Sequence, residues 1–224
     1  MCATEPPLMP NIRGIEAAQV IHPSPARLSR ANELVCWSVR NKMPSSGICP
    51  VRVRRVTAID LPAIARIHMA SWHDAYRGVI PDDALCGRTI EGSLSGWRFT
   101  FEKFPDNLSV AETGDALPSG FCCAGPVIDA EKNAPFEFEI YGLHVVPAMR
   151  RRGIGAALLR AALNRAVVRE RKSSAIVWTL KDLGPSRRFY VREGGELVKT
   201  GTWTVGRVEL PEVAYGWRDL GATG

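Results

Sequence analysis

The stretch that decides the fold is residues 139–159, which read EIYGLHVVPAMRRRGIGAALL. It predicts a strand that ends at Pro147 and, after a short arginine-rich turn, a helix that begins near Gly155. Apolar residues recur in that helix at i, i+4 and i+7, which is the stripe of a helix packed on a sheet. This stretch therefore predicts a strand, a basic turn that contains glycine, and a helix, in that order.

The turn between this strand and this helix has the chemistry of a phosphate site. A helix N-terminus leaves backbone N–H groups unpaired and carries a partial positive charge. Gly153 and Gly155 remove side chains that would keep a phosphate away, and the arginines at 150–152 add charge and donors. The spacing matches neither a Walker A loop nor the dinucleotide GxGxxG fingerprint. On these residues alone, a pyrophosphate site and a plain tight turn both stay open.

Regular secondary structure is predicted on both sides of this stretch from periods of 2 and 3.6. The upstream elements are a strand at 51–56, a helix from 60 to about 72, a loop at 73–81, helices at 82–86 and 96–104, and strands at 107–112, 120–128 and 136–146. Downstream, we expect a strand at 175–180, a helix at 185–193 and a closing hairpin at 196–205 and 208–217. This mixture indicates an α/β (α+β mixed) class with one central sheet.

Residues 1–50 differ from the rest of the chain. Prolines recur there, and no segment holds a period of 2 or 3.6, although a short helix around 26–39 is considered. We expect an N-terminal extension that is disordered or loosely docked, followed by one folded domain at residues 51–220. A start codon assigned too far upstream would give the same pattern.

The composition limits what the chain can be. Its 224 residues, 46% of them hydrophobic, can bury one substantial core. No apolar run approaches the roughly 20 residues of a membrane span, and no secretory signal is recognised. We therefore expect a cytoplasmic protein without a membrane partner. Six cysteines and four histidines show none of the spacings of a zinc site, so no metal is expected.

Two further segments accompany the stretch at 139–159, one on each side. Residues 67–81 read IHMASWHDAYRGVIP, and residues 186–194 read SRRFYVREG. In this order the three segments resemble motifs of the GNAT (Gcn5-related) N-acetyltransferase superfamily, and the resemblance covers about residues 51–220. It implies the GNAT fold, a central, mostly antiparallel twisted sheet flanked by helices.

The same resemblance implies an acyltransferase that uses acetyl-CoA. It would move the acetyl group directly to a primary amine of a small molecule or peptide, which is the acceptor partner. Main-chain groups of Leu143, His144 and Val145 would hold the acetyl carbonyl and the pantetheine arm. The pyrophosphate would be wrapped by Arg150, Arg151, Arg152, Gly153, Ile154, Gly155 and Ala156.

Four side chains receive roles from the resemblance. Tyr190 would act as the general acid that returns a proton to the thiolate, and Glu139 would act as the general base through water. Trp72 and Tyr76 would line the acceptor pocket. On the residues alone, the three aromatic side chains could equally be core residues, and Glu139 could be an exposed strand residue.

Strict alternation along the predicted strand adds a geometric expectation. It places Glu139, Tyr141, Leu143 and Val145 on one face of the strand and His144 on the other. We therefore expect His144 to have a structural role on the face away from Glu139.

The sequence departs from the family pattern at three positions, and two other classes of protein stay open. Arg151 stands where Gly or Lys is frequent, Leu183 where an asparagine is usual, and Gly195 where Phe is usual. The loss of that asparagine leaves open a catalytically inactive acyl-CoA-binding regulatory module. A nucleic-acid-binding protein is disfavoured, because the arginine cluster lacks interleaved aromatics and CoA phosphates explain its charge better. The acceptor amine and a homodimer stay undecided.

Overall fold

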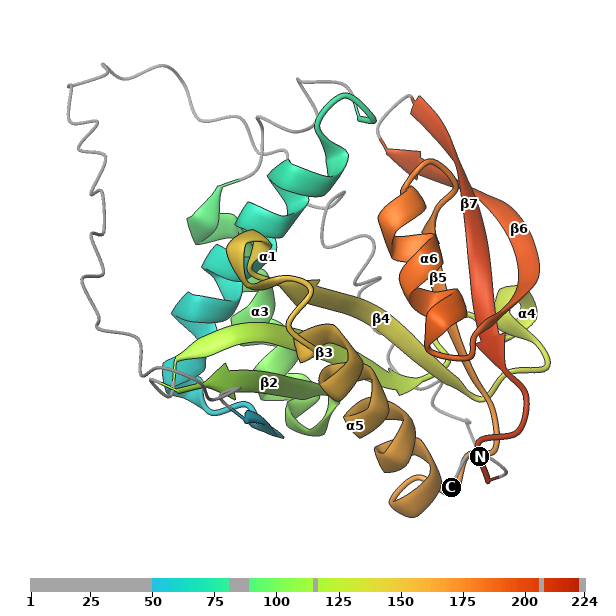
Figure 1. The fold of residues 1–224 in the computed structure, drawn as a ribbon, viewed down its shortest axis with the longest axis horizontal. Coiled ribbons are helices and arrows are strands. Elements are labelled where there is room, and N and C mark those ends of the chain that lie inside the picture. The colour runs from blue at the N-terminus through green and yellow to red at the C-terminus, as the bar shows by residue number, and fades with distance from the viewer. Residues whose placement is uncertain (1–49, 81–88, 115–116, 206–207, 222–224) are drawn as a thin grey trace, which may run out of the picture.

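The computed structural model of the chain describes residues 50–80, 89–114, 117–205 and 208–221 (Figure 1). The predicted extension, apart from Pro50, and the helices predicted near 26–39 and 82–86 lie outside the described residues. Within them, one sheet of seven strands has the order β1-β2-β3-β4-β5-β7-β6. None of the helices in these ranges is both long and apolar enough to cross a membrane.

The sheet is mostly antiparallel, as expected. Its strands are β1 (Val51–Arg55), β2 (Leu108–Thr113), β3 (Pro118–Pro126), β4 (Phe138–Val145), β5 (Ala175–Leu180), β6 (Glu196–Val205) and β7 (Val208–Trp217). All neighbours pair antiparallel except β4 and β5, which are parallel and are joined through a helix. The strands predicted downstream of 139–159 have the observed boundaries.

The boundaries of the helices agree less closely with those predicted from the sequence. They are α1 (Leu61–Tyr76), α3 (Ile90–Lys103), α4 (Ala130–Asn133), α5 (Ile154–Val168) and α6 (Gly184–Arg192), with short 3-10 turns η1 (Ala58–Asp60), η2 (Pro105–Asn107) and η3 (Pro147–Met149). The loop predicted from residue 73 begins too early, because α1 continues through Tyr76 and carries its aromatic residues one turn further. The α4 helix was not predicted, since four residues are too short for a periodic signal.

The helices cover both faces of the sheet. In Figure 1, α5 and α6 lie in front of the sheet, and α3 lies behind it. Leu158 and Leu159 of α5 are fully buried against one face, in a cluster that also contains Tyr190 of α6. Ile64 of α1 and Trp97 of α3 belong to a second cluster on the other face. The result is a three-layer arrangement, as expected for a sheet flanked by helices.

The sheet opens in the middle because β4 and β5 diverge. Their pairing runs only from Phe138 opposite Ala175 to Ile140 opposite Val177. Both strands continue beyond this point, β4 as far as Val145, without pairing to each other. In the described residues, no strand pairs with that edge of β4 beyond Ile140. Unpaired main-chain groups at such an edge need other partners, which a ligand can supply.

A β-bulge at Tyr141 reverses the alternation along β4. Ala124 of β3 lies opposite Ile140, but the next residue, Cys123, lies opposite Gly142, so Tyr141 is the extra residue. After the bulge, Leu143 packs on the α5 side of the sheet, and so does Val145.

The expectation that Glu139, Leu143 and Val145 share one face is therefore wrong. Phe138 and Ile140 pack on the α5 side, so Glu139 between them faces the α1 side. His144 stacks on Phe121, which belongs to the cluster of α1 and α3. His144 thus shares a face with Glu139, because one additional residue shifts every later side chain to the opposite face.

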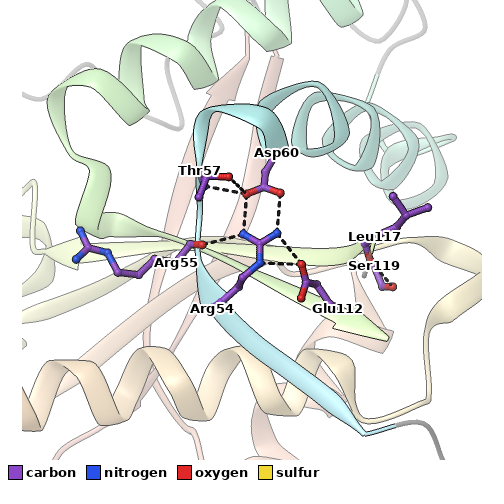
Figure 2. A network of polar contacts seen from close by, with 7 residues as sticks. All are labelled: Arg54, Arg55, Thr57, Asp60, Glu112, Leu117 and Ser119. Carbon is purple, nitrogen blue, oxygen red and sulfur yellow. Dashed lines mark hydrogen bonds and ion pairs between the residues drawn. The ribbon is translucent and has the colours of Figure 1, made fainter. Parts of the chain in front are cut away.

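An ionic network fixes the start of α1 (Figure 2). Arg54 of β1 donates to both carboxylate oxygens of Asp60 and to Glu112 of β2. Thr57 donates to Asp60 from its backbone N–H and its hydroxyl, at 2.8 and 2.9 Å. Asp60 is the predicted N-cap residue of α1, but its carboxylate binds Arg54 and Thr57 instead of the first turn of the helix.

Candidate active site

The turn before α5 contains two residues with left-handed backbone conformations. Gly153, the N-cap of α5, has a φ of 81°, and Arg151 has a φ of 65°. A Cβ at Gly153 would meet no atom within 4 Å, so glycine serves the backbone conformation there. The helix begins where the N–H of Ala157 donates to the Gly153 carbonyl at 2.9 Å. The N–H groups of residues 154–156 consequently have no acceptor within α5.

The three arginines of this turn are exposed and differ in their partners. Arg150 forms an ion pair with Asp74 in the last turn of α1. Within the described part of the chain, no ion pair engages Arg151 or Arg152. Their charge adds to the partial charge of the helix N-terminus, which favours an anion at this place.

Ile154, Gly155 and Val145 were also predicted to bind the cofactor, and they can offer it main-chain groups more readily than side chains. The Ile154 side chain is 1% exposed and belongs to the core. A Cβ at Gly155 would lie 3.4 Å from the ring of Phe189, so α5 and α6 approach closely at this glycine. Of the predicted strand residues, Val145 already accepts a hydrogen bond from Ser71 of α1 at 3.2 Å.

Tyr190 of α6 is buried in the cluster that α5 forms with one face of the sheet. Its ring lies 5.1 Å from that of Phe189 and 6.0 Å from that of Tyr215, measured between centroids. Burial raises the pKa of the Tyr190 phenol well above its ordinary value, and Cys122 and Tyr76 raise it further. This phenol is neutral at physiological pH and holds a proton that it can donate.

A cavity of about 100 Å³ lies on the other side of the diverging strands. From α1, α3 and β4 it is lined by His68, Trp72, Tyr76, Trp97, Tyr141 and His144. The strands beyond the opening contribute Trp178, Trp203 and Glu212. Trp72 and Tyr76 were predicted to line the acceptor pocket, and both line this cavity.

One wall of the cavity is a cluster of three aromatic side chains with tilted and edge-on contacts. The rings of Trp72 and Tyr76 are 4.3 Å apart, and Trp203 of β6 lies 6.0 and 6.3 Å from them. Helix α1 and strand β6 thereby meet across the opening of the sheet. An aromatic wall of this kind binds apolar groups, and it also binds cations through the faces of its rings.

Two histidines continue the cavity wall next to Trp72, whose ring meets that of His68 edge-on at 5.9 Å. The ring of His144 is stacked on Phe121 with centroids 5.0 Å apart, and it meets His68 edge-on at 5.1 Å. Nδ1 of His68 accepts a hydrogen bond from Trp97 Nε1 at 3.4 Å and lies 3.0 Å from Ser93 Oγ. Burial lowers the pKa of His144 to about 4, so its imidazole is neutral at physiological pH.

Glu139, the predicted base, is not among the residues that line the cavity. Its side chain is buried and accepts a hydrogen bond from Asn133 Nδ2 of α4 at 3.0 Å. Asn133 in turn accepts from Trp178 Nε1 at 2.7 Å. The amide therefore links this carboxylate to the wall of the cavity.

Glu212 is the acidic residue on the cavity wall in the described residues. It is 4% exposed and forms an ion pair with Lys132 of α4. The ammonium group of Lys132 also lies 4.4 Å from the centre of the Trp178 ring. The charge of Glu212 is thus compensated by a residue from a helix that the sequence did not predict.

Comparison with known proteins assigns the chain to a family. The family described as "Acetyltransferase (GNAT) family" matches residues 66–195, which include the turn before α5, β4 and Tyr190. The chain belongs to the GNAT family. It is an acetyltransferase, and its seven-stranded sheet with flanking helices is the GNAT fold. The family resemblance of the three sequence segments is confirmed.

Relatives of the chain include N-acetyltransferases of bacteria and archaea. The uncharacterized N-acetyltransferase YuaI of Bacillus subtilis is 28% identical over 172 residues, which cover 77% of this chain and 95% of YuaI. An uncharacterized N-acetyltransferase of Archaeoglobus fulgidus is 30% identical over 146 residues, 64% of this chain and 91% of that protein.

Solved GNAT structures share the fold at low sequence identity. PaiA N-acetyltransferase of Thermoplasma acidophilum, solved with coenzyme A, has a TM-score of 0.53 at 16% identity and covers 73% of this chain and 98% of its own. YncA of Salmonella typhimurium, solved with acetyl-CoA, has a TM-score of 0.56 at 16% identity and covers 75% of this chain and 94% of its own.

The GNAT motifs predicted part of the site and missed another part. They do not include Trp178, Trp203 or Glu212, which come from the C-terminal strands and reach the cavity only through sheet pairing. The role of His144 on the cavity wall was missed because the bulge at Tyr141 has no signal in the alternation of the strand.

Proposed function

We propose that the chain transfers the acetyl group of acetyl-CoA directly to a primary amine of a small molecule or peptide. One observation carries the proposal. The unpaired edge of β4 runs from the exposed N-terminus of α5 to an aromatic cavity on the opposite face of the sheet. A donor bound along that edge and an acceptor in the cavity would meet where β4 and β5 diverge.

The residues present fit acetyl-CoA. The N–H groups of residues 154–156 and the charges of Arg150, Arg151 and Arg152 suit a pyrophosphate. The open edge of β4, at Leu143 to Val145, offers main-chain groups to the pantetheine arm in the manner of a neighbouring strand. When bound, acetyl-CoA supplies the activated acetyl group.

Tyr190 is the proposed general acid. Its raised pKa keeps the phenol protonated until a thiolate leaves, and its ring belongs to the buried cluster against which Leu143 of β4 packs. Glu139 is the base that the sequence predicted. Because its carboxylate is buried and held by Asn133, proton removal by Glu139 would require water molecules between it and the amine.

Two measurements test the proposed function. Calorimetry should show that acetyl-CoA binds to the purified full-length chain, and thiol release should be detected with at least one member of a panel of primary amines. Absence of acetyl-CoA binding would contradict the site at α5. Tight binding without turnover of any amine would contradict catalysis and favour a regulatory acyl-CoA-binding module.

A further inference from the structure

The imidazole of His144 lies on the acceptor side of the strand along which the acetyl donor is proposed to bind. We propose that His144 is the general base of the reaction, which accepts the proton of the acceptor amine as that amine attacks the acetyl group. This inference rests on the proposed function and assigns to His144, in place of Glu139, the removal of the proton from the amine.

The position of the ring depends on the bulge and on a glycine. The bulge at Tyr141 turns His144 to the cavity face, and the ring folds back over Gly142. A Cβ at Gly142 would lie 3.2 Å from His144 Nε2, so the imidazole occupies space that a side chain at this position would restrict. Both residues line the cavity at the point where β4 has lost its pairing to β5.

The ring nitrogens of His144 are available to a substrate. Neither of them hydrogen-bonds to another protein group within the described residues. His68, the second histidine of the wall, differs in this respect, because its Nδ1 accepts from Trp97 and lies beside Ser93. Glu139 differs as well, because Asn133 occupies one of its oxygens and the carboxylate does not line the cavity.

The charges around His144 favour its neutral form, which is the form that can accept a proton. Arg150 from the turn after β4 lowers its pKa in addition to burial. The other titratable groups that face it are His68 from α1, Tyr141 from its own strand and, across the cavity, Tyr76 and Glu212. The negative charge of Glu212 is compensated by Lys132, as described above.

The chemical step balances with the residues named. A neutral primary amine forms the C–N bond to the acetyl carbon, and its nitrogen becomes positively charged and strongly acidic. His144 accepts one proton from that nitrogen as the C–S bond breaks, and Tyr190 gives its proton to the departing sulfur. The products are the amide and the thiol, and the proton on His144 returns to the Tyr190 phenolate or to solvent.

The first test compares His144→Gln with His73→Gln in the full-length protein. His73 lies in α1 and is not among the residues that line the cavity. We expect H144Q to lower kcat with a turned-over amine by roughly 100-fold, in the range of general base catalysis, while the Kd of acetyl-CoA stays within about twofold. H73Q should leave both values unchanged.

A second variant separates a chemical role from a structural one. In His144→Ala the lost ring leaves space in the cavity, so added imidazole should restore part of the rate in proportion to its concentration. A merely structural role predicts no such rescue. If H144Q were as active as the wild type, the assignment to His144 would be overturned. It would also be overturned if Glu139→Gln abolished activity while H144Q did not.

A third measurement needs no acceptor. NMR titration of the imidazole signals, with H144Q identifying the signal among the four histidines, should show that His144 stays neutral down to about pH 5. A ring that is protonated at pH 7 would overturn the proposal whether or not an amine is found. Acetyl-CoA binding without turnover of any amine would overturn both proposals, whereas activity indifferent to H144Q overturns only this one.

Discussion

Arg54 donates two hydrogen bonds to the carboxylate of Asp60, from Nη1 at 2.7 Å and from Nη2 at 2.8 Å (Figure 2). The pair joins β1 to the residue that precedes α1 and is extended by Glu112 of β2. This ion pair anchors the N-terminal end of α1. Trp72 and Tyr76, which line the cavity, lie near the C-terminal end of the same helix. The Asp60 side chain is 4% exposed and that of Arg54 is 26% exposed, so the pair is partly buried.

Asp60→Asn should destabilise the protein by about 1 to 3 kcal/mol at pH 7, because it leaves Arg54 with half of its charge compensation in a partly buried place. The pKa of Asp60 is lowered from 3.8 to about 2, chiefly by the hydrogen bond from Arg54. A lowered carboxylate pKa contributes stability above about pH 4, and this contribution is lost as the pH falls from 4 to 2. Urea unfolding should therefore show a difference between wild type and D60N that shrinks below pH 4.

Asp106→Asn provides the matched control for D60N. Asp106 pairs with Arg55, the neighbour of Arg54, but both side chains are more than half exposed. Exposed ion pairs contribute little, so D106N should change the free energy of unfolding by less than about 1 kcal/mol. Equal effects of D60N and D106N would show that burial of the Arg54 pair is unimportant.

The left-handed backbone of Arg151 leads to a prediction about the phosphate turn. Arg151→Gly and Arg151→Ala both remove the charge, but only glycine adopts a φ of 65° without steric cost. We expect R151G to be more stable than R151A by about 1 kcal/mol. Both variants should bind acetyl-CoA more weakly than the wild type, and R151A should bind it more weakly than R151G.

Urea unfolding and calorimetry of the two Arg151 variants provide the measurement. The charge effect common to both should diminish at high salt, since exposed charges are screened, and the backbone difference should persist. Identical stabilities of R151G and R151A would mean that the turn relaxes to another conformation once the arginine is removed.

Tyr190→Phe should lower kcat by roughly 100-fold or more, because the variant keeps the ring but has no proton to give to the sulfur. Acetyl-CoA affinity should change little, since the N–H groups and charges that suit the pyrophosphate belong to the turn before α5 and not to α6. Tyr215→Phe is the control, because Tyr215 lies beside Tyr190 and its hydroxyl bonds to Arg187 at 3.2 Å. Steady-state kinetics with both variants tests the role, and a fully active Y190F would refute it.

The lowered pKa of His144 predicts a dependence of stability on pH. The ordinary histidine pKa of 6.5 falls to about 4 in the folded protein, so the unfolded chain binds more protons between these values. The contribution of His144 to stability is therefore complete above pH 6.5 and is lost as the pH falls toward 4. At pH 5 the loss should be about 2 kcal/mol relative to pH 8, and H144Q should lack it. Urea unfolding of both proteins at the two pH values measures this difference.

Much of the fold could be predicted from local patterns. The hairpin of β6 and β7 has the predicted boundaries, because apolar periodicity and the turn around Gly206 are properties of neighbouring residues. Gly153 was predicted in the turn before the helix, and it is the left-handed N-cap residue of α5. In contrast, α4 was not predicted. Its residues Lys132 and Asn133 bind Glu212 and Glu139, respectively.

The sequence by itself determined the family, the order of the elements and the basic glycine turn at the start of α5, because each depends on residues close together in the chain. Only the tertiary structure decided which side chains meet in the cavity. The bulge at Tyr141 turned His144 to the face of Glu139, and pairing in the sheet brought Trp203 to Trp72. The physical reason is that one unpaired residue in a strand exchanges its two faces, and the partner strand, not the local sequence, decides where that residue lies.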